Sequence, residues 1–151
     1  MTMDGENRYQ VTRTAHVNAP ASRVYDIISD YRHGHPRILP PQFRNLVVEQ
    51  GGRGAGTRIS FQMKAFGRTM SFRHEVVEPE PGRVLVEKDR DNDSKTTFTI
   101  DPVQGGSRVT ITSDLVSRPG LAGKIEQFLS KRFLQGVYDE EIKKLEALAR
   151  S

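Results

Sequence analysis

The stretch that decides the fold is TRISFQMKAFGRTMSFRHEVV, residues 57–77. Apolar and polar side chains alternate along it on both sides of Gly67, with a period of two that is typical of β-strands with one buried face. The glycine between the two runs predicts a turn, so the stretch is expected to form an antiparallel hairpin. The face expected to be buried carries Ile59, Phe61, Met63, Met70, Phe72, His74 and Val76.

The same alternation continues from this hairpin in both directions. It occurs upstream in residues 9–18 and 45–50, and downstream in residues 84–88, 96–100 and 108–116. Short connections and one-sided alternation favour an antiparallel meander. A sheet of this width is too broad to lie flat beneath one helix, so we expect it to twist and curl.

Helical segments are predicted at two places in the chain. Pro20 and the apolar spacing that follows it predict a short amphipathic helix, and a second short helix is expected from about Asp30. Residues 121–149 have helical spacing with few breakers and predict one long C-terminal helix. A curled sheet around one long helix leaves space where their side chains do not meet, and such a cavity is a usual place for a ligand.

The long helix carries two apolar stripes that differ in phase. The first comprises Leu121, Ile125, Phe128 and Leu129, and the second Leu134, Tyr138, Ile142, Leu145 and Leu148. At about 100° per residue, Leu145 lies roughly 120° around the axis from Leu121. We therefore expect the helix either to bend, at Gly136, or to wrap around a curved surface.

The composition fits one globular domain and excludes several classes of function. A length of 151 residues suits a single domain, with an ordered core over about residues 8–149. The chain has no cysteine, which excludes disulfides and thiolate chemistry, and no apolar run long enough for stable membrane insertion. Residues 1–9 are polar and unlike a signal peptide, so we expect a cytoplasmic location. The net charge of +4 permits attraction to anionic ligands or membrane surfaces without requiring nucleic acid.

Four stretches, taken in order, resemble a known family. Residues 17–31, VNAPASRVYDIISDY, are similar to its opening strand and helix, and residues 54–58, GAGTR, to its GxGTR turn. Residues 76–83, VVEPEPGR, are similar to its V-x-x-P connection, and residues 142–146, IKKLE, to its terminal helix. On these grounds the chain resembles the START-like (SRPBCC) superfamily, in its polyketide cyclase/dehydrase-like branch.

The resemblance implies a fold more firmly than an activity. The fold is the α+β helix-grip, in which a curved antiparallel seven-stranded sheet wraps around a long C-terminal helix, with two short helices between the first two strands. Members of the family bind lipids, carry or cyclise aromatic polyketides, or serve as partners of other proteins. The function therefore has to be argued from the site.

The predicted cavity is apolar, with a few polar anchors. Its wall is expected on the concave face of the sheet and on the first half of the long helix, where methionine and phenylalanine would make it adaptable. Arg37, His74 and Arg132 are the candidate polar anchors, and Tyr31 and Arg37 lie in a segment that resembles the family's cavity mouth. The expected ligand-binding residues are Tyr31, Arg37, Ile59, Phe61, Met63, Met70, Phe72, His74, Val86, Phe98, Ile100, Phe128, Leu129 and Arg132.

His74 has two interpretations. It shares the inward phase of its strand, and a buried imidazole needs hydrogen-bond partners, so it is either a satisfied core histidine or a polar anchor or acid/base for a ligand. Tyr31 is the other weak candidate for proton transfer. No convergent acid/base pair is evident, so no catalytic residue is assigned.

No metal or cofactor is expected. His33 and His35 lie two apart in a loop without a third ligand nearby, and we expect both to be solvated. Asp89, Asp91 and Asp93 resemble the start of a calcium loop, but the residues required further along such a loop are missing. We expect a solvated hairpin tip there.

Three functions are compatible with this sequence. The first is binding or transport of a hydrophobic small molecule, lipid-like or polycyclic, in an internal cavity. The second is a polyketide cyclase, aromatase or dehydratase, and the third is a protein-interaction module, which a large exposed apolar patch would favour. We expect a monomer or weak homodimer with no nucleic-acid partner.

Overall fold

The structure, a computed structural model, describes residues 7–151. Residues 1–6, part of the segment on which the signal-peptide argument was made, lie outside this range. The elements are β1 (Arg8–Val17), α1 (Ala21–Ser29), the 3-10 turn η2 (His35–Arg37), β2 (Phe43–Gln50), β3 (Arg58–Ala65), β4 (Arg68–Glu80), β5 (Val84–Asp89), β6 (Lys95–Val103), β7 (Gly106–Val116) and α2 (Gly120–Ala149).

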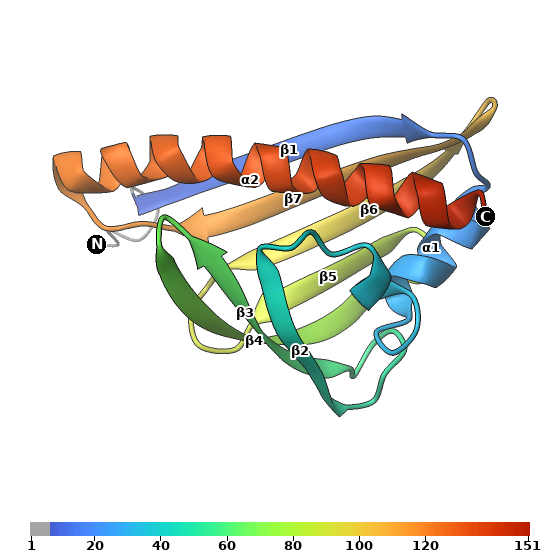
Figure 1. The fold of residues 1–151 in the computed structure, drawn as a ribbon, viewed down its shortest axis with the longest axis horizontal. Helices are drawn as coiled ribbons and strands as arrows, with labels where there is room; N and C mark the ends of the chain where they lie inside the picture. Colours follow the sequence, from blue (N-terminus) through green and yellow to red (C-terminus); the bar gives the residue numbers. More distant parts are fainter. Residues whose placement is uncertain (1–6) are drawn as a thin grey trace.

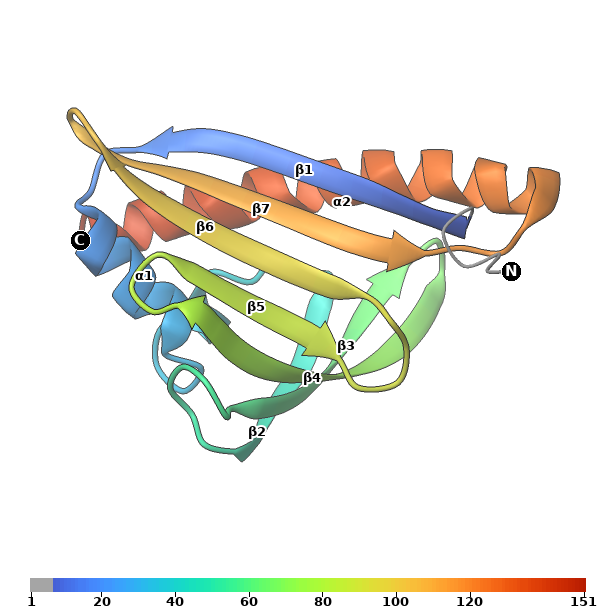
Figure 2. The ribbon, with the colours of Figure 1, turned by 180° about the vertical axis from the view of Figure 1, so that it is seen from behind.

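The strands form one antiparallel sheet. Its order is β1-β7-β6-β5-β4-β3-β2, so consecutive strands from β2 to β7 are neighbours and β1 closes beside β7. The sheet curls, and α2 runs along its concave side (Figures 1 and 2). The helix-grip fold expected from the sequence is therefore confirmed.

Only one α-helix lies between β1 and β2. The second short helix expected from about Asp30 is reduced to the three-residue 3-10 turn η2. Pro36 and the prolines at positions 40 and 41 prevent a longer helix, because proline lacks the N–H and disfavours helical geometry in the residue before it. This turn directs the His35 side chain into the molecule, where it is 3% exposed.

The β3–β4 hairpin forms as its alternation predicts. Phe61 pairs with Phe72 and Met63 with Met70, and the turn contains Phe66 and Gly67, both with positive φ. Side chains in the expected phase of β3 are buried, whereas the outer end of β4 near Met70 is exposed. The hairpin thus supplies one inward-facing wall that opens towards solvent at its turn.

Part of the fully buried core lies at the end of the molecule where α1 meets the sheet. Val24 and Ile28 of α1, Ile100 of β6 and Leu145 of α2 are each at most 1% exposed and belong to one cluster. In Figure 1 this is the end at which α1 and the red C-terminal half of α2 meet the sheet. The N-terminal half of α2 extends beyond this core.

The two stripes of α2 have different surroundings. Tyr138, Ile142 and Leu145 are buried, whereas Leu121 and Phe128 are 75% and 60% exposed. The helix runs unbroken through Gly136 (Figure 1). The helix has no break at Gly136, where one of the two expected explanations placed a bend. The phase difference exists because the first stripe faces away from the sheet.

Replacing Gly136 by alanine should stabilise the protein. Gly136 is exposed inside a helix, and a methyl group built there meets no atom within 4 Å. Alanine loses less backbone entropy than glycine on folding, so we expect a gain of about 0.5–1 kcal/mol in the free energy of unfolding. Urea denaturation measures it, and a loss of stability would show that the helix needs the glycine.

Candidate functional site

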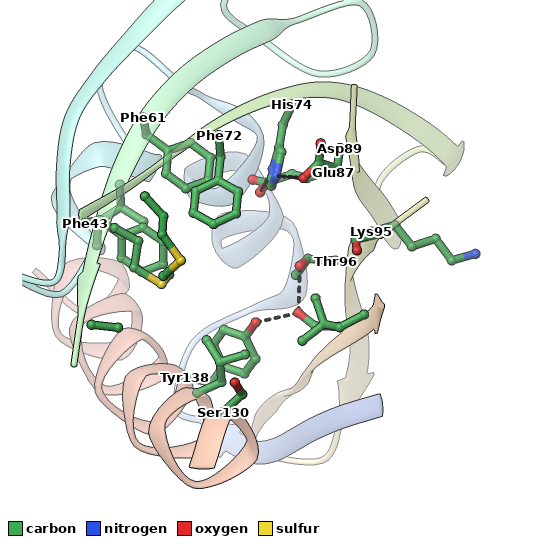
Figure 3. A pocket seen from close by; sticks show the side chains of 18 of the residues that line it. Phe43, Phe61, Phe72, His74, Glu87, Asp89, Lys95, Thr96, Ser130 and Tyr138 are labelled. Carbon is green, nitrogen blue, oxygen red and sulfur yellow. Dashed lines mark hydrogen bonds and ion pairs between the residues drawn. The ribbon is translucent and has the colours of Figure 1, made fainter. Parts of the chain in front are cut away.

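A cavity of about 300 Å³ lies between the sheet and α2. This volume is at the lower end of the range of small-molecule sites, about 300–1,000 Å³. Most of its wall is apolar, and three phenylalanine rings lie along one side of it (Figure 3). Its apolar residues include Leu39, Phe43, Leu46, Ile59, Phe61, Met63, Phe72, Phe98, Leu115, Phe133 and Leu134.

The aromatic side of the cavity is formed by β2, β3 and β4. The Phe61 and Phe72 rings are stacked with centroids 5.3 Å apart, and the Phe43 ring lies 5.7 Å from Phe61. The hairpin register sets this arrangement, because Phe61 and Phe72 are direct cross-strand partners. Such a wall presents flat apolar surfaces to a bound molecule.

The cavity opens at the end of the sheet away from the core. The lining residues Phe66, Met70 and Val116 are 62%, 41% and 44% exposed, and Lys95 beside them is also exposed. These residues belong to the β3–β4 turn, the start of β6 and the end of β7. The mouth expected near residues 31–37 is therefore misplaced: η2 lies at the closed end, because its His35 is buried against the core.

The buried end of the cavity holds an ionisable cluster centred on Glu87. The Tyr31 hydroxyl donates to Glu87 Oε2 at 2.5 Å, and His74 Nδ1 lies 3.3 Å from Oε1. His35 Nε2 lies 3.6 Å from Oε2. All four residues are at most 9% exposed. Glu87 is thus a buried carboxylate whose oxygens are met from three sides.

His35 is held in one orientation. Its Nδ1 lies 2.7 Å from the Ile28 carbonyl oxygen, which can only accept, so Nδ1 carries a hydrogen. Its ring stacks on Tyr31 with centroids 4.5 Å apart. The second nitrogen, Nε2, therefore points to two carboxyls, at 3.6 Å from Glu87 and 3.8 Å from Glu141.

The two carboxyls of the cluster have opposite tendencies. Burial acts to raise the pKa of Glu87, but the hydrogen bond with His74 and the neighbouring His35 outweigh it and hold this pKa below its usual range. Burial, together with the charge of Glu87, raises the pKa of Glu141 well above its usual range. Glu87 is therefore the carboxylate of the cluster and Glu141 favours its protonated form.

Glu141 faces the cavity without a hydrogen-bond partner within residues 7–151. It projects from α2, is 3% exposed, and lies 3.8 Å from His35 Nε2. A protonated carboxyl offers one O–H donor and further acceptor capacity. Because buried polar groups are normally satisfied, this carboxyl is suited to a polar atom of a ligand.

A hydroxyl chain forms another polar part of the wall. The Tyr138 hydroxyl makes a short contact with Ser113 Oγ, which lies 2.7 Å from Thr96 Oγ1. Burial raises the pKa of Tyr138, so its hydroxyl stays protonated. Figure 3 shows Tyr138 and Thr96 across the cavity from the phenylalanines. Apolar and polar contacts thus come from opposite sides.

The structure brings half of the predicted ligand-binding residues to the cavity. Its lining includes Ile59, Phe61, Met63, Met70, Phe72, His74 and Phe98. His74 has the hydrogen-bond partner that a buried imidazole requires, and its other nitrogen, Nε2, lies 3.9 Å from Asp89 Oδ2. It is therefore both a satisfied histidine and a cavity residue.

The other predicted residues lie elsewhere, for three reasons. Tyr31 and Ile100 are fully buried, Tyr31 against Glu87 and Ile100 in the core. Val86 sits between the inward residues Leu85 and Glu87, so it is out of phase with the wall. The remaining four predicted residues are exposed and do not line the cavity, which corrects the prediction: Arg37, Phe128, Leu129 and Arg132.

Sequence reasoning missed the polar residues that matter most. Glu87 and Asp89 were missed because β5 was given the wrong inward phase. His35 was expected to be solvated, and Glu141 was not among the residues expected at the cavity. Glu141 lies seven residues, about two helical turns, after the inward-facing Leu134, and this spacing is the signal that would have located it.

Neither a metal centre nor a transmembrane helix is found in the described part of the chain. Within residues 7–151 no group of three or more His, Cys, Asp or Glu side chains could hold a metal ion. No helix there is both long and apolar enough to cross a membrane. The imidazoles of His35 and His74 at this site lie beside carboxyl groups of the protein.

A comparison with known families identifies the chain. The sequence model for polyketide cyclase / dehydrase and lipid transport proteins matches residues 8–150. The chain belongs to this family. Among proteins with curated descriptions, none matches. A shared fold does not fix one activity, so the match leaves the particular ligand or reaction open.

Solved structures agree with the family assignment on the fold. The KanY protein has a TM-score of 0.85 at 24% identity, covering 95% of this chain and 99% of its own. TTHA0849 from Thermus thermophilus has a TM-score of 0.78 at 23% identity, with 95% and 99% covered. The Zhui aromatase/cyclase from Streptomyces sp. R1128 has a TM-score of 0.72 at 16% identity, with 95% and 94% covered. At these identities the likeness concerns the fold alone.

Proposed function

We propose that this family member binds a hydrophobic small molecule, lipid-like or flat and polycyclic, in the cavity between its sheet and α2. The observation that carries this proposal is the cavity-facing, buried Glu141 carboxyl without a protein hydrogen bond within residues 7–151. An apolar cavity with one such group suits a mainly apolar molecule with an oxygen atom at one end. The cytoplasmic location stays a prediction.

The charges around the cavity specify that polar end further. Within the described residues no arginine lines the cavity, and its lining lysine, Lys95, lies at the opening. An anionic head group at the buried end would lie beside the Glu87 carboxylate, at a Coulombic cost in a poorly solvated site. A carbonyl or hydroxyl oxygen can instead accept a hydrogen bond from protonated Glu141. Affinity would come mostly from apolar burial, at about 25 cal/mol per Å².

Filling the cavity should abolish binding. Ser130 lines it from α2, so Ser130→Phe places a ring in the space that the ligand needs. With Nile red, a neutral polycyclic dye that carries a carbonyl, fluorescence titration should show binding to the wild-type protein that Ser130→Phe weakens at least about tenfold, since the lost apolar burial exceeds about 1.4 kcal/mol.

The matched control is Lys143→Phe, which adds the same ring on the exposed side of the same helix. It should bind the dye as the wild type does. Mass spectrometry of molecules released from the native protein would identify the natural ligand. The proposal is wrong if no ligand is released and no neutral hydrophobic dye binds the wild type.

A polyketide cyclase or dehydratase is the second candidate. The observation in its favour is that a hydrogen-bonded imidazole, His74, and a carboxyl inclined to hold its proton, Glu141, line one cavity. Together they could accept and donate protons while the cavity folds a polyketide-like chain. Replacing His74 by alanine should then remove turnover of a poly-β-ketone substrate, whereas a binding protein would show only altered affinity.

A further inference from the structure

The first half of α2 exposes an apolar stripe. Leu121, Ile125, Phe128 and Leu129 are 75%, 54%, 60% and 44% exposed. They are spaced as i, i+4, i+7 and i+8, so they form one face of the helix. Single exposed apolar residues are ordinary on protein surfaces, but a contiguous row of large ones indicates a contact site.

This face of the helix is apolar only in the first half of α2. Ile125 and Lys143 are eighteen residues, about five turns, apart and therefore lie on the same face, as do Leu129 and Ala147. The second half of that face is polar or small, as expected for a solvated surface. The first half of that face is apolar although it is exposed as well.

The stripe lies beside the mouth of the cavity. Phe133, one turn beyond Leu129, packs against Phe66 of the β3–β4 turn, with ring centroids 5.4 Å apart. Phe66 and Met70 are themselves exposed at the opening. In Figure 1 the orange half of α2 and the β3–β4 turn lie at the same end of the molecule. We call these exposed residues, together with the stripe, the mouth surface: Phe66, Met70, Leu121, Ile125, Phe128 and Leu129.

Cations without acidic partners surround the mouth surface. Lys124, Lys131 and Arg132 flank the stripe on α2, and Lys64 and Arg68 flank the β3–β4 turn. Within residues 7–151 none of these five forms an ion pair; Arg132 lies over the Phe128 ring at 5.8 Å instead. Glu126, on the same half of α2, is already paired with Arg118 at 2.9 Å. The surface therefore combines large apolar side chains with uncompensated positive charge.

We propose that the mouth surface docks on an anionic lipid bilayer. An amphipathic helix with apolar residues on one face and lysine or arginine beside them is suited to the interface of a membrane, which it enters without spanning. Each cation near an anionic surface adds about 1 kcal/mol of attraction. A second copy of the chain fits less well, because an isologous contact through the stripe would bring these cations close to their own copies.

This docking would give the cavity a route to its ligand. The mouth surface borders the opening, so a docked molecule would present that opening to the acyl chains rather than to water. An apolar ligand could then enter or leave without crossing the aqueous phase. This consequence rests on the proposed ligand binding, whereas the docking itself does not.

Co-sedimentation with vesicles tests the docking. The full chain should bind vesicles of phosphatidylcholine with about 30 mol% phosphatidylserine at least tenfold more tightly than phosphatidylcholine alone, and added salt should weaken the binding. The double substitution I125S/F128S should reduce binding at least tenfold. K131Q should reduce it about fivefold, the equivalent of one cation's attraction. The matched control R108Q, at the start of β7 and so at the opposite end of that strand from Val116 at the opening, should leave it within about twofold.

Nile red binding keeps this test separate from that of the proposed function. If I125S/F128S still binds the dye, the variant is folded and its loss of vesicle binding reports on the surface. The docking proposal is overturned if the wild type does not bind anionic vesicles. It is equally overturned if the chain dimerises, or captures a partner protein, through the stripe and shows no vesicle binding.

Discussion

Replacing Glu87 by alanine is expected to lower the free energy of unfolding by about 3–5 kcal/mol at pH 7. Glu87 is 7% exposed and meets the Tyr31 hydroxyl at 2.5 Å, His74 at 3.3 Å and His35 at 3.6 Å. Alanine removes the acceptor common to all three and leaves them buried without it. Urea denaturation of both proteins measures the loss, and E87Q, which keeps the shape without the charge, should fall between them.

This loss should depend on pH in a defined direction. The pKa of Glu87 is lowered in the folded protein, so its contribution to stability is present above the pKa of an unfolded glutamate, about 4.3. That contribution is lost as the pH falls through the lower, folded value. The difference in stability between the wild type and E87A should therefore be full at pH 7 and shrink in acid.

Glu75 provides the control for Glu87. It lies on the neighbouring strand β4 and pairs with Arg58 at 3.4 Å, with both side chains 39% exposed. A half-exposed pair of this kind contributes at most about 1 kcal/mol, so E75A should be nearly neutral. If E87A also stays within about 1 kcal/mol of the wild type, the buried cluster does not hold the cavity wall together.

The fold was predictable because its strands are half-buried. Alternation in residues 57–77 fixes which face of the hairpin is covered, and a one-residue error would expose every apolar side chain. Residues 69–77 needed only one correction: β4 continues to Glu80 through a register shift after Val77. Prolines in the segment after α1 likewise indicated a break, although one 3-10 turn remained where a helix was expected.

The site was predicted on β3 and β4 but not on β5. In β5 the residues Leu85, Val86 and Glu87 are all buried, so apolar character does not distinguish the two faces of this strand. Choosing Val86 as the inward residue was reasonable from hydrophobicity alone and wrong. The deciding contacts come from Tyr31 and His74, which are distant in sequence from Glu87, and no local pattern encodes them.

The helix shows a different failure. Two residues of the first apolar stripe, Phe128 and Leu129, were assigned to the cavity because apolar side chains are normally buried. The structure instead turns Ser130, Leu134 and Glu141 to the cavity and leaves Phe128 and Leu129 exposed. The phase difference between the two stripes was visible in the sequence. The sequence did not indicate which of the two stripes the sheet covers. The stripe that it leaves exposed is the basis for the docking proposal.

The deep end and the mouth of the cavity therefore differ in chemistry. The deep end carries ionisable side chains that contact one another, and among them the Glu141 carboxyl has no hydrogen bond within residues 7–151. The mouth carries apolar side chains surrounded by cations that form no ion pair within residues 7–151. A molecule that enters polar end first, and keeps its apolar part towards the mouth, would match both.

Replacing Glu141 by glutamine is expected to stabilise the protein at neutral pH and to have little effect near pH 4. Burial and the charge of Glu87 raise the pKa of Glu141 in the folded state. Above the pKa of an unfolded glutamate, the unfolded chain then releases a proton that the folded chain retains. Stability consequently falls as the pH rises towards the folded pKa, by up to about 1.4 kcal/mol for each pH unit. Glutamine has the shape of the protonated carboxyl and no proton to release.

Urea denaturation of E141Q and the wild type between pH 4 and 8 measures this difference. The two stability curves should meet in acid and diverge towards pH 8, with E141Q the more stable protein. The comparison of the wild type with E87A has the opposite sign, because there the variant is the less stable protein at neutral pH. E140Q, one position earlier on the same helix, makes the same substitution outside the cavity lining and serves as the control. If E141Q is less stable than the wild type at pH 7, or the two curves stay parallel, Glu141 is ionised in the folded protein. The hydrogen bond it is proposed to donate to a ligand would then be excluded.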